Sequence, residues 1–195
     1  LYVTRQLRTL DEAATNRYLA MIDSVDDTID KCHDAKQKAA LLLIRAVAYS
    51  DTQNNEAAID DLTAVVQLDS TQTLAYWQRA VCQARLNAFN ASQGTDISMK
   101  TANVLSDLSE AIENNPSAIL YYNRGNVYVQ RKDYLHAIED YSKAIEMDSH
   151  LAEAYYNRGI ARLALKQQAQ AVADLSKAGE LGLYAAYSII KQNRK

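Results

Sequence analysis

The segment AILYYNRGNVYVQRKDYLHAIEDYSKAIEMDSHL (residues 118–151) is followed directly by AEAYYNRGIARLALKQQAQAVADLSKAGELGLYA (residues 152–185), and the two align with an offset of 34 residues. The pentapeptide YYNRG stands at the same place in both copies. Self-similarity at a fixed period of roughly 20–50 residues is the sequence signature of a repeat architecture. The period therefore indicates the fold before any single residue is interpreted.

Two more diverged copies precede this pair. One begins at Ala39, where Ala46 takes the place of Gly125. The next begins at Thr73 and carries about eleven extra residues near 87–103, because its arginine is 45 rather than 34 residues from the arginine of the following copy. The sequence predicts four repeats, over residues 39–72, 73–117, 118–151 and 152–183.

Each copy has the pattern of two packed helices. Apolar residues recur at three-to-four spacing, as in Leu135, Ile138 and Tyr141, which is typical of an amphipathic helix. Small residues such as Gly125 and Ala137 would let the two helices approach closely. The chain holds only 5 Gly and 1 Pro, so turn-rich β-folds are poorly supported and the composition favours an all-α protein.

These features resemble the tetratricopeptide repeat, whose signature places aromatic, small and Ala residues at set spacings. The copy at 118–151 carries Tyr121, Gly125, Tyr128, Ala137, Tyr141 and Ala144, with Ser149 at the position of the final Pro. The copy at 152–183 keeps Tyr155, Gly159, Ala171 and Ala178, but has Arg162 and Leu175 in place of two aromatics. The resemblance implies an all-α fold, a right-handed α-solenoid of antiparallel helix pairs.

The segments around the repeats do not fit the 34-residue frame. Residues 1–38 are predicted to hold a helix that is either an N-terminal cap or a truncated upstream repeat, and both interpretations stay open. Residues 184–195 are predicted to form a C-terminal capping helix with a basic tail. The polar insertion near 87–103, which contains Gly94, is predicted to form a loop between lengthened helices.

An Arg and an Asp recur at fixed repeat positions. These residues are Arg45, Arg79, Arg124 and Arg158, with Asp61, Asp107, Asp140 and Asp174. A charged pair that recurs in every copy predicts a structural salt bridge between helices or repeats rather than four active sites.

Several classes of function are disfavoured. The net charge of −3 without a dense Lys/Arg cluster argues against nucleic acid as a partner, and the absence of a run of 18 apolar residues argues against direct membrane insertion. The three histidines are scattered, and no common catalytic, metal-binding or phosphate-binding motif is present. We therefore predict no enzyme, no catalytic residue, no metal site and no cofactor, and interpret Cys32 and Cys82 as buried thiols.

The resemblance also indicates a binding surface. In tetratricopeptide-like stacks the first helix of each pair lines a concave groove, and the residue after the signature aromatic points into it. Aromatic rings supply rigid contact area, and amide side chains can bond both the N–H and the C=O of an extended peptide. The predicted peptide-binding residues are Leu43, Trp77, Gln78, Tyr122, Asn123, Asn126, Tyr156 and Asn157.

The leading hypothesis is a non-catalytic protein–protein interaction scaffold that binds a peptide segment of a partner in this groove. The alternative is a structural or assembly segment of a larger repeat protein, acting through its convex face, its ends or the insertion loop. A third hypothesis is a small-molecule binder or enzyme. The sequence leaves homo-oligomer formation open. It also leaves a cytoplasmic or a cell-envelope location open, because it begins at Leu1 and we expect its start to be missing.

Overall fold

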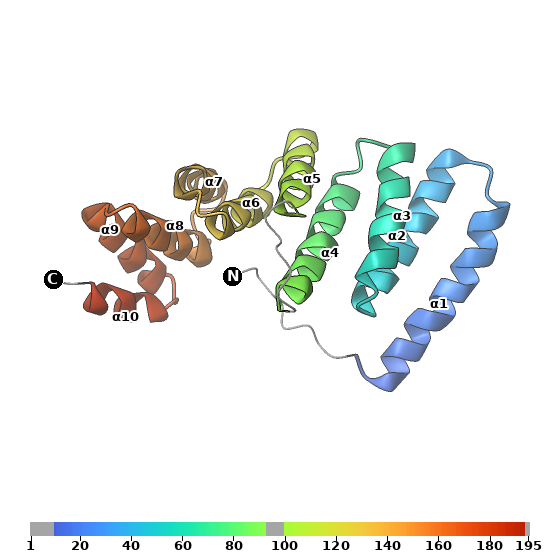
Figure 1. Ribbon diagram of the computed structural model, residues 1–195, viewed down its shortest axis with the longest axis horizontal. Coiled ribbons are helices and arrows are strands. Elements are labelled where there is room, and N and C mark those ends of the chain that lie inside the picture. Colours follow the sequence, from blue (N-terminus) through green and yellow to red (C-terminus); the bar gives the residue numbers. More distant parts are fainter. Residues whose placement is uncertain (1–9, 93–99, 194–195) are drawn as a thin grey trace. The chain divides into compact units, whose positions relative to one another are not determined.

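The computed structural model describes residues 10–92 and 100–193, and every regular element in those ranges is a helix (Figure 1). The helices are α1 (Glu12–Lys31), α2 (Ala35–Asp51), α3 (Asn55–Leu68), α4 (Thr73–Ser92), α5 (Lys100–Asn114), α6 (Ala118–Gln130), α7 (Tyr134–Met147), α8 (Ala152–Ala164), α9 (Gln168–Glu180) and α10 (Ala185–Gln192). The prediction of an all-α fold is confirmed.

The chain divides into two compact units, which are described separately: the first ends at Asn115 and the second begins at Pro116. In the first unit α2 pairs with α3 and α4 with α5, while α3 packs on α4 and α1 packs on α2. In the second unit α6 pairs with α7 and α8 with α9, while α7 packs on α8 and α10 packs on α9. Consecutive helices therefore form the predicted pairs.

The predicted repeat boundaries stay a prediction, but the helices add detail to them. Helix α2 begins at Ala35, four residues before the boundary at Ala39, and α1 runs through the middle of segment 1–38. Helix α4 has 20 residues where α6 has 13, so the insertion lengthens it. Of the segment 87–103, which is predicted to contain a loop, residues 93–99 with Gly94 lie outside the described residues, as do the last two residues of the basic tail.

Close approach of the two helices in a pair depends on glycine in the second unit. A Cβ atom built on Gly125 would lie 2.8 Å from the ring of Tyr141 on the partner helix. The same atom on Gly159 would lie 2.8 Å from Leu175. Both separations are shorter than a carbon–carbon contact allows, so any larger residue would force the pair apart. The predicted role of Gly125 is confirmed.

The recurring arginine and aspartate form a two-pronged ion pair across every helix pair. In the first pair Arg45 donates from Nε and Nη2 to the two carboxylate oxygens of Asp61, at 2.8 and 2.6 Å. The other three pairs repeat this geometry at 2.7 to 2.9 Å, and the four aspartate side chains are only 5% to 8% exposed. Two parallel bonds in a desolvated site fix orientation as well as adding energy. The structural salt bridge predicted from the sequence is confirmed.

The remaining guanidinium nitrogen, Nη1, reaches back to the preceding helix. Arg79 donates to Thr63 Oγ1 at 3.1 Å, and Arg158 donates to Ser142 Oγ at 2.9 Å. Thr63 and Ser142 each stand two residues after the aspartate of the preceding pair. One arginine therefore joins the two helices of its own pair and connects that pair to the one before.

Helix α1 supplies the same contact for the first pair. Arg45 Nη1 donates to Asp26 Oδ1 at 2.7 Å, so α1 occupies the place that the second helix of a preceding pair occupies elsewhere. Each arginine also stacks on a tyrosine ring, 5.6 to 5.8 Å from its centroid. A guanidinium over an aromatic face gains cation–π attraction and stays shielded from water.

The turns within three pairs share one backbone conformation. Gln53, Lys132 and Lys166 have φ of 65°, 60° and 60°. After each of them the next amide bonds a carbonyl five residues back, as in Asp133 N to Tyr128 O at 2.9 Å. This is the Schellman helix ending, whose left-handed residue is usually glycine because a Cβ there is strained.

We expect Lys132→Gly to raise the free energy of unfolding by about 0.5–1 kcal/mol, because it removes the strain of a left-handed residue and leaves the turn hydrogen bonds in place. The matched control is Lys143→Gly inside α7, which should lower it by about 1 kcal/mol. Urea denaturation followed by circular dichroism measures both. Equal losses in the two variants would contradict the assignment of strain.

We expect Asp174→Ala to lower the free energy of unfolding by about 3 kcal/mol, because it leaves Arg158 and Arg162 without their shared carboxylate. The control Glu139→Ala removes an exposed carboxylate from α7 and should change stability by less than about 0.5 kcal/mol. Thermal and urea denaturation of both variants give the comparison. A loss no larger than that of the control would show that the ion pair is not stabilising.

Candidate functional site

The predicted binding residues all lie on the first helices of the pairs, in two groups. Leu43 lies on α2, and Trp77 and Gln78 lie on α4, within the first unit. The second unit holds Tyr122, Asn123 and Asn126 on α6, with Tyr156 and Asn157 on α8. Helices α6 and α8 are in contact, so residues of two successive pairs meet in the second unit.

Hydrogen bonds join three of the predicted binding residues and a fourth residue, Tyr141, that was not among them. Tyr141 on α7 donates from its hydroxyl to Asn126 Oδ1 at 2.8 Å. Asn157 Nδ2 donates to the same oxygen at 2.9 Å and to the Tyr122 hydroxyl at 3.1 Å. We call Tyr122, Asn126, Tyr141 and Asn157 the tyrosine–asparagine cluster.

The cluster is buried to different depths. Tyr122 and Asn126 are each 2% exposed and Tyr141 is 1% exposed, whereas Asn157 is partly exposed. The rings of Tyr122 and Tyr141 lie 5.9 Å apart, centroid to centroid. Tyr122 and Asn126 therefore belong to the interior of the second unit, and the cluster reaches the surface through Asn157.

Burial raises the pKa of both phenols in the cluster, Tyr122 and Tyr141, above the ordinary value of tyrosine. Loss of water disfavours the phenolate form, so both hydroxyls keep their protons at neutral pH. A protonated hydroxyl can donate one hydrogen bond and also accept one. The Tyr141 hydroxyl donates to Asn126, and the Tyr122 hydroxyl accepts from Asn157.

Some hydrogen-bonding capacity of these amides is unused. Both protons of Asn157 Nδ2 are directed to partners inside the cluster, and its Oδ1 accepts no bond from any described residue. Asn126 Nδ2 is buried and has no acceptor among the described residues. A buried donor without an acceptor costs free energy, and this one lies in the interior with the rest of Asn126, so Asn157 Oδ1 is the unused group nearer the surface.

Asn123 and Tyr156 lie at the more accessible part of the same two helices. Both are partly exposed, and the amide of Asn123 makes no hydrogen bond with a described residue. Asn123 and Asn157 stand 34 residues apart, at one position of successive repeats. The two side chains therefore occupy equivalent positions on adjacent first helices.

The first unit shows a related feature at its predicted residues. Leu43, Trp77 and Gln78 are partly exposed, and Leu43 packs against the apolar core of that unit. The indole nitrogen of Trp77 is buried and has no acceptor among the described residues. Both units thus hold an unpaired N–H donor on a helix that the sequence analysis assigned to the groove.

Two features of this region were missed in the sequence analysis. The first is Tyr141, whose position was read only as a signature aromatic although its hydroxyl completes the cluster. The second is the pattern of aspartate, any residue, then Ser or Thr, which recurs as Asp61 to Thr63 and Asp140 to Ser142. That recurrence was visible in the sequence and would have predicted the third arginine contact.

Among the described residues no three His, Cys, Asp or Glu side chains gather as metal ligands would, and no helix there is both long and apolar enough to span a bilayer. Cys82 is buried and burial raises its pKa, while Cys32 is half-buried and donates to the Asp34 carbonyl at 3.4 Å. Neither thiol forms a disulfide.

Comparisons with known proteins agree with the repeat pattern. The family model of the TPR repeat matches residues 125–166. Human tetratricopeptide repeat protein 13 is 30% identical over 111 residues, which is 54% of this chain but only 12% of that much longer protein.

Solved structures show the same fold. MamA is 23% identical with a TM-score of 0.75, over 91% of this chain and 98% of its own. YrrB, a TPR protein with an unusual peptide-binding site, is 16% identical with a TM-score of 0.67, over 89% of this chain and 87% of its own. Residues 125–166 therefore match the tetratricopeptide repeat, and the chain has the fold of these solved repeat proteins.

Proposed function

We propose that the chain is a non-catalytic protein-interaction scaffold, and that its second unit binds an extended peptide segment of a partner across α6 and α8. Solenoid repeats commonly present extended binding surfaces of this kind. The observation that carries the proposal is the pair of unused amide groups on two adjacent first helices, the Asn123 amide and Asn157 Oδ1, both on partly exposed side chains.

An extended peptide supplies what these amides lack. Its backbone offers a carbonyl and an N–H at every residue, and it can bond both kinds of group in a side-chain amide. Asn157 Oδ1 would accept from a peptide N–H, because both donors of Asn157 are held within the cluster. The amide of Asn123 is available to both groups. The bonds to Tyr122 and Asn126 fix Asn157 before binding, which lowers the entropy lost on association.

The aromatic residues have two different roles in this proposal. Tyr156 is partly exposed and supplies apolar contact area beside the amides. Tyr122 is buried and supports Asn157 from below instead of contacting the peptide. In the first unit Trp77, Gln78 and Leu43 offer the same combination of apolar area, a side-chain amide and an unpaired N–H.

Similarity to YrrB supports a peptide as the ligand class, since that structure shares the fold and has a peptide-binding site. This chain matches only 12% of tetratricopeptide repeat protein 13, so that protein gives no basis for naming a partner of this one.

A second candidate function is assembly through the exposed face of α1. A hollow of about 330 Å³ there is lined by Leu10, Ala14, Tyr18 and Met21 with Arg17, and the side chain of Leu19 on the same helix is 48% exposed. Since helices of repeat proteins pack on both sides, this apolar surface favours an association through that end.

We expect the double variant Asn123→Ala/Tyr156→Ala to lose a partner that the parent chain captures from a lysate of the source cells, as identified by mass spectrometry. The matched control is Asn16→Ala/Tyr184→Ala, which removes an exposed amide and an exposed tyrosine ring elsewhere. The partner should bind the parent and the control, and bind the double variant at least tenfold more weakly in a titration with its purified binding segment. Tyr122 is left unchanged because its buried ring supports the fold.

Identical captures by the parent and the folded double variant would contradict a site on α6 and α8. Circular dichroism establishes that each variant is folded. The variant Leu19→Asp separates the second candidate, since loss of self-association or of a captured protein in that variant alone would favour assembly through α1.

A further inference from the structure

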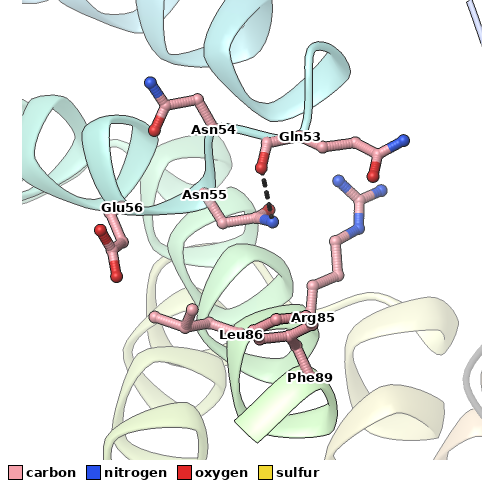
Figure 2. A pocket seen from close by; sticks show the side chains of 7 residues that line it. All are labelled: Gln53, Asn54, Asn55, Glu56, Arg85, Leu86 and Phe89. Carbon is pink, nitrogen blue, oxygen red and sulfur yellow. Dashed lines mark hydrogen bonds between the residues drawn. The ribbon is translucent and has the colours of Figure 1, made fainter.

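The first unit contains a cavity away from the predicted groove residues. Its volume is about 460 Å³, within the range of about 300–1,000 Å³ that small ligand sites have. It lies between the turn that joins α2 to α3 and the C-terminal half of α4 (Figure 2). The lining residues are Gln53, Asn54, Asn55, Glu56, Arg85, Leu86 and Phe89.

Arg85 brings a positive charge to this cavity, and no carboxylate of the described residues neutralises it. Its Nη1 donates to Ser50 Oγ at 2.8 Å and to the Ser50 carbonyl at 3.4 Å, which anchors the guanidinium. No described carboxylate lies within ion-pair distance of it, in contrast to Arg45 and Arg79 of the same unit. The nitrogens not bonded to Ser50 can therefore donate to an anionic ligand.

Asn55 brings an unused acceptor. Its Nδ2 donates to the Gln53 carbonyl at 3.2 Å, drawn as the dashed line in Figure 2, and this bond orients the amide. Its Oδ1 is buried and accepts no hydrogen bond from the described residues. The left-handed backbone at Gln53 holds that carbonyl in place. A ligand N–H would satisfy the oxygen.

Leu86 and Phe89 provide the apolar wall. Phe89 follows Arg85 by one helical turn, so the two side chains lie on one face of α4. The phenylalanine is 64% exposed, which leaves most of its ring in water. In Figure 2 the Glu56 side chain lies across the cavity from Arg85, so an acidic ligand is attracted only on the Arg85 side.

We propose that this cavity binds a short acidic–apolar segment of a partner protein. The Asp or Glu carboxylate of the segment pairs with Arg85, a backbone N–H donates to Asn55 Oδ1, and a neighbouring large apolar side chain packs on Leu86 and Phe89. Consecutive residues of a peptide offer these three groups together, and the charge is complementary. The site is separate from α6 and α8 and does not rest on the function proposed for them.

The test is a titration of the full ¹⁵N-labelled chain, followed by NMR, with an acetylated and amidated hexapeptide of sequence glycine-serine-glutamate-leucine-serine-glycine. We expect saturable shifts at the amides of Asn55, Leu86 and Phe89. The same peptide with glutamine for glutamate should bind at least tenfold more weakly, because it keeps the shape and loses the charge.

Two pairs of variants locate the site. Arg85→Gln should weaken binding at least tenfold, while Arg17→Gln, which removes an exposed arginine from α1, should leave it unchanged. Phe89→Ala should weaken binding severalfold, while Leu19→Ala should not. Both pairs match the change in charge or in apolar area, and Phe89 is exposed enough that its truncation leaves the fold intact.

Three outcomes would overturn the proposal. The glutamine peptide binding as tightly as the glutamate peptide would show that Arg85 does not select an acid. Shifts that never saturate, or that spare Asn55 and Phe89, would show that the cavity does not bind the segment. N-acetyl-leucine with a free carboxylate binding as tightly as the hexapeptide would assign the cavity to a small carboxylic acid instead of a protein segment.

Discussion

The ion pair between an arginine on the first helix and an aspartate on the second is the constraint on which the rest of the structure depends. It recurs in all four pairs, with the carboxylates almost excluded from water. An isolated charge would be costly there, so each pair of helices holds its register only when both partners are aligned. Because Arg79 and Arg158 also bond a hydroxyl of the preceding pair, one side chain sets two packing relationships.

Much of the fold could be predicted because the sequence contains four copies of one helix-pair pattern. The close approach at Gly125 and the pairing of Arg124 with Asp140 could be predicted from residue type and spacing alone. The structure shows both. The burial of Tyr122 and Asn126 could not be predicted in the same way. It depends on where the Tyr141 hydroxyl lies across α6 and α7, which no spacing within one helix specifies. The cavity beside Arg85 could not be predicted either, because it depends on how the C-terminal half of α4 lies against the turn between α2 and α3.

The candidate site consists of first-helix residues that lie beside those that align the helices of each pair. The arginines, aspartates and small residues align the two helices of each pair, whereas Asn123, Tyr156 and Asn157 on the first helices remain partly exposed. Asn157 is held by buried partners yet has an open acceptor, and that combination of a rigid base and an unused polar atom is what recognition of a peptide backbone requires.

The reach of each arginine has a consequence for cooperativity. Among the described residues, Arg158 donates hydrogen bonds to Asp174 and to Ser142 of the neighbouring pair, and Arg79 donates to Asp107 and Thr63. Coupling of this nearest-neighbour kind makes stability a sum over adjacent pairs within each unit. Helices α1 and α10 each pack on a single helix, so they would open before the helices that pack on two neighbours, and their amides would exchange hydrogen sooner.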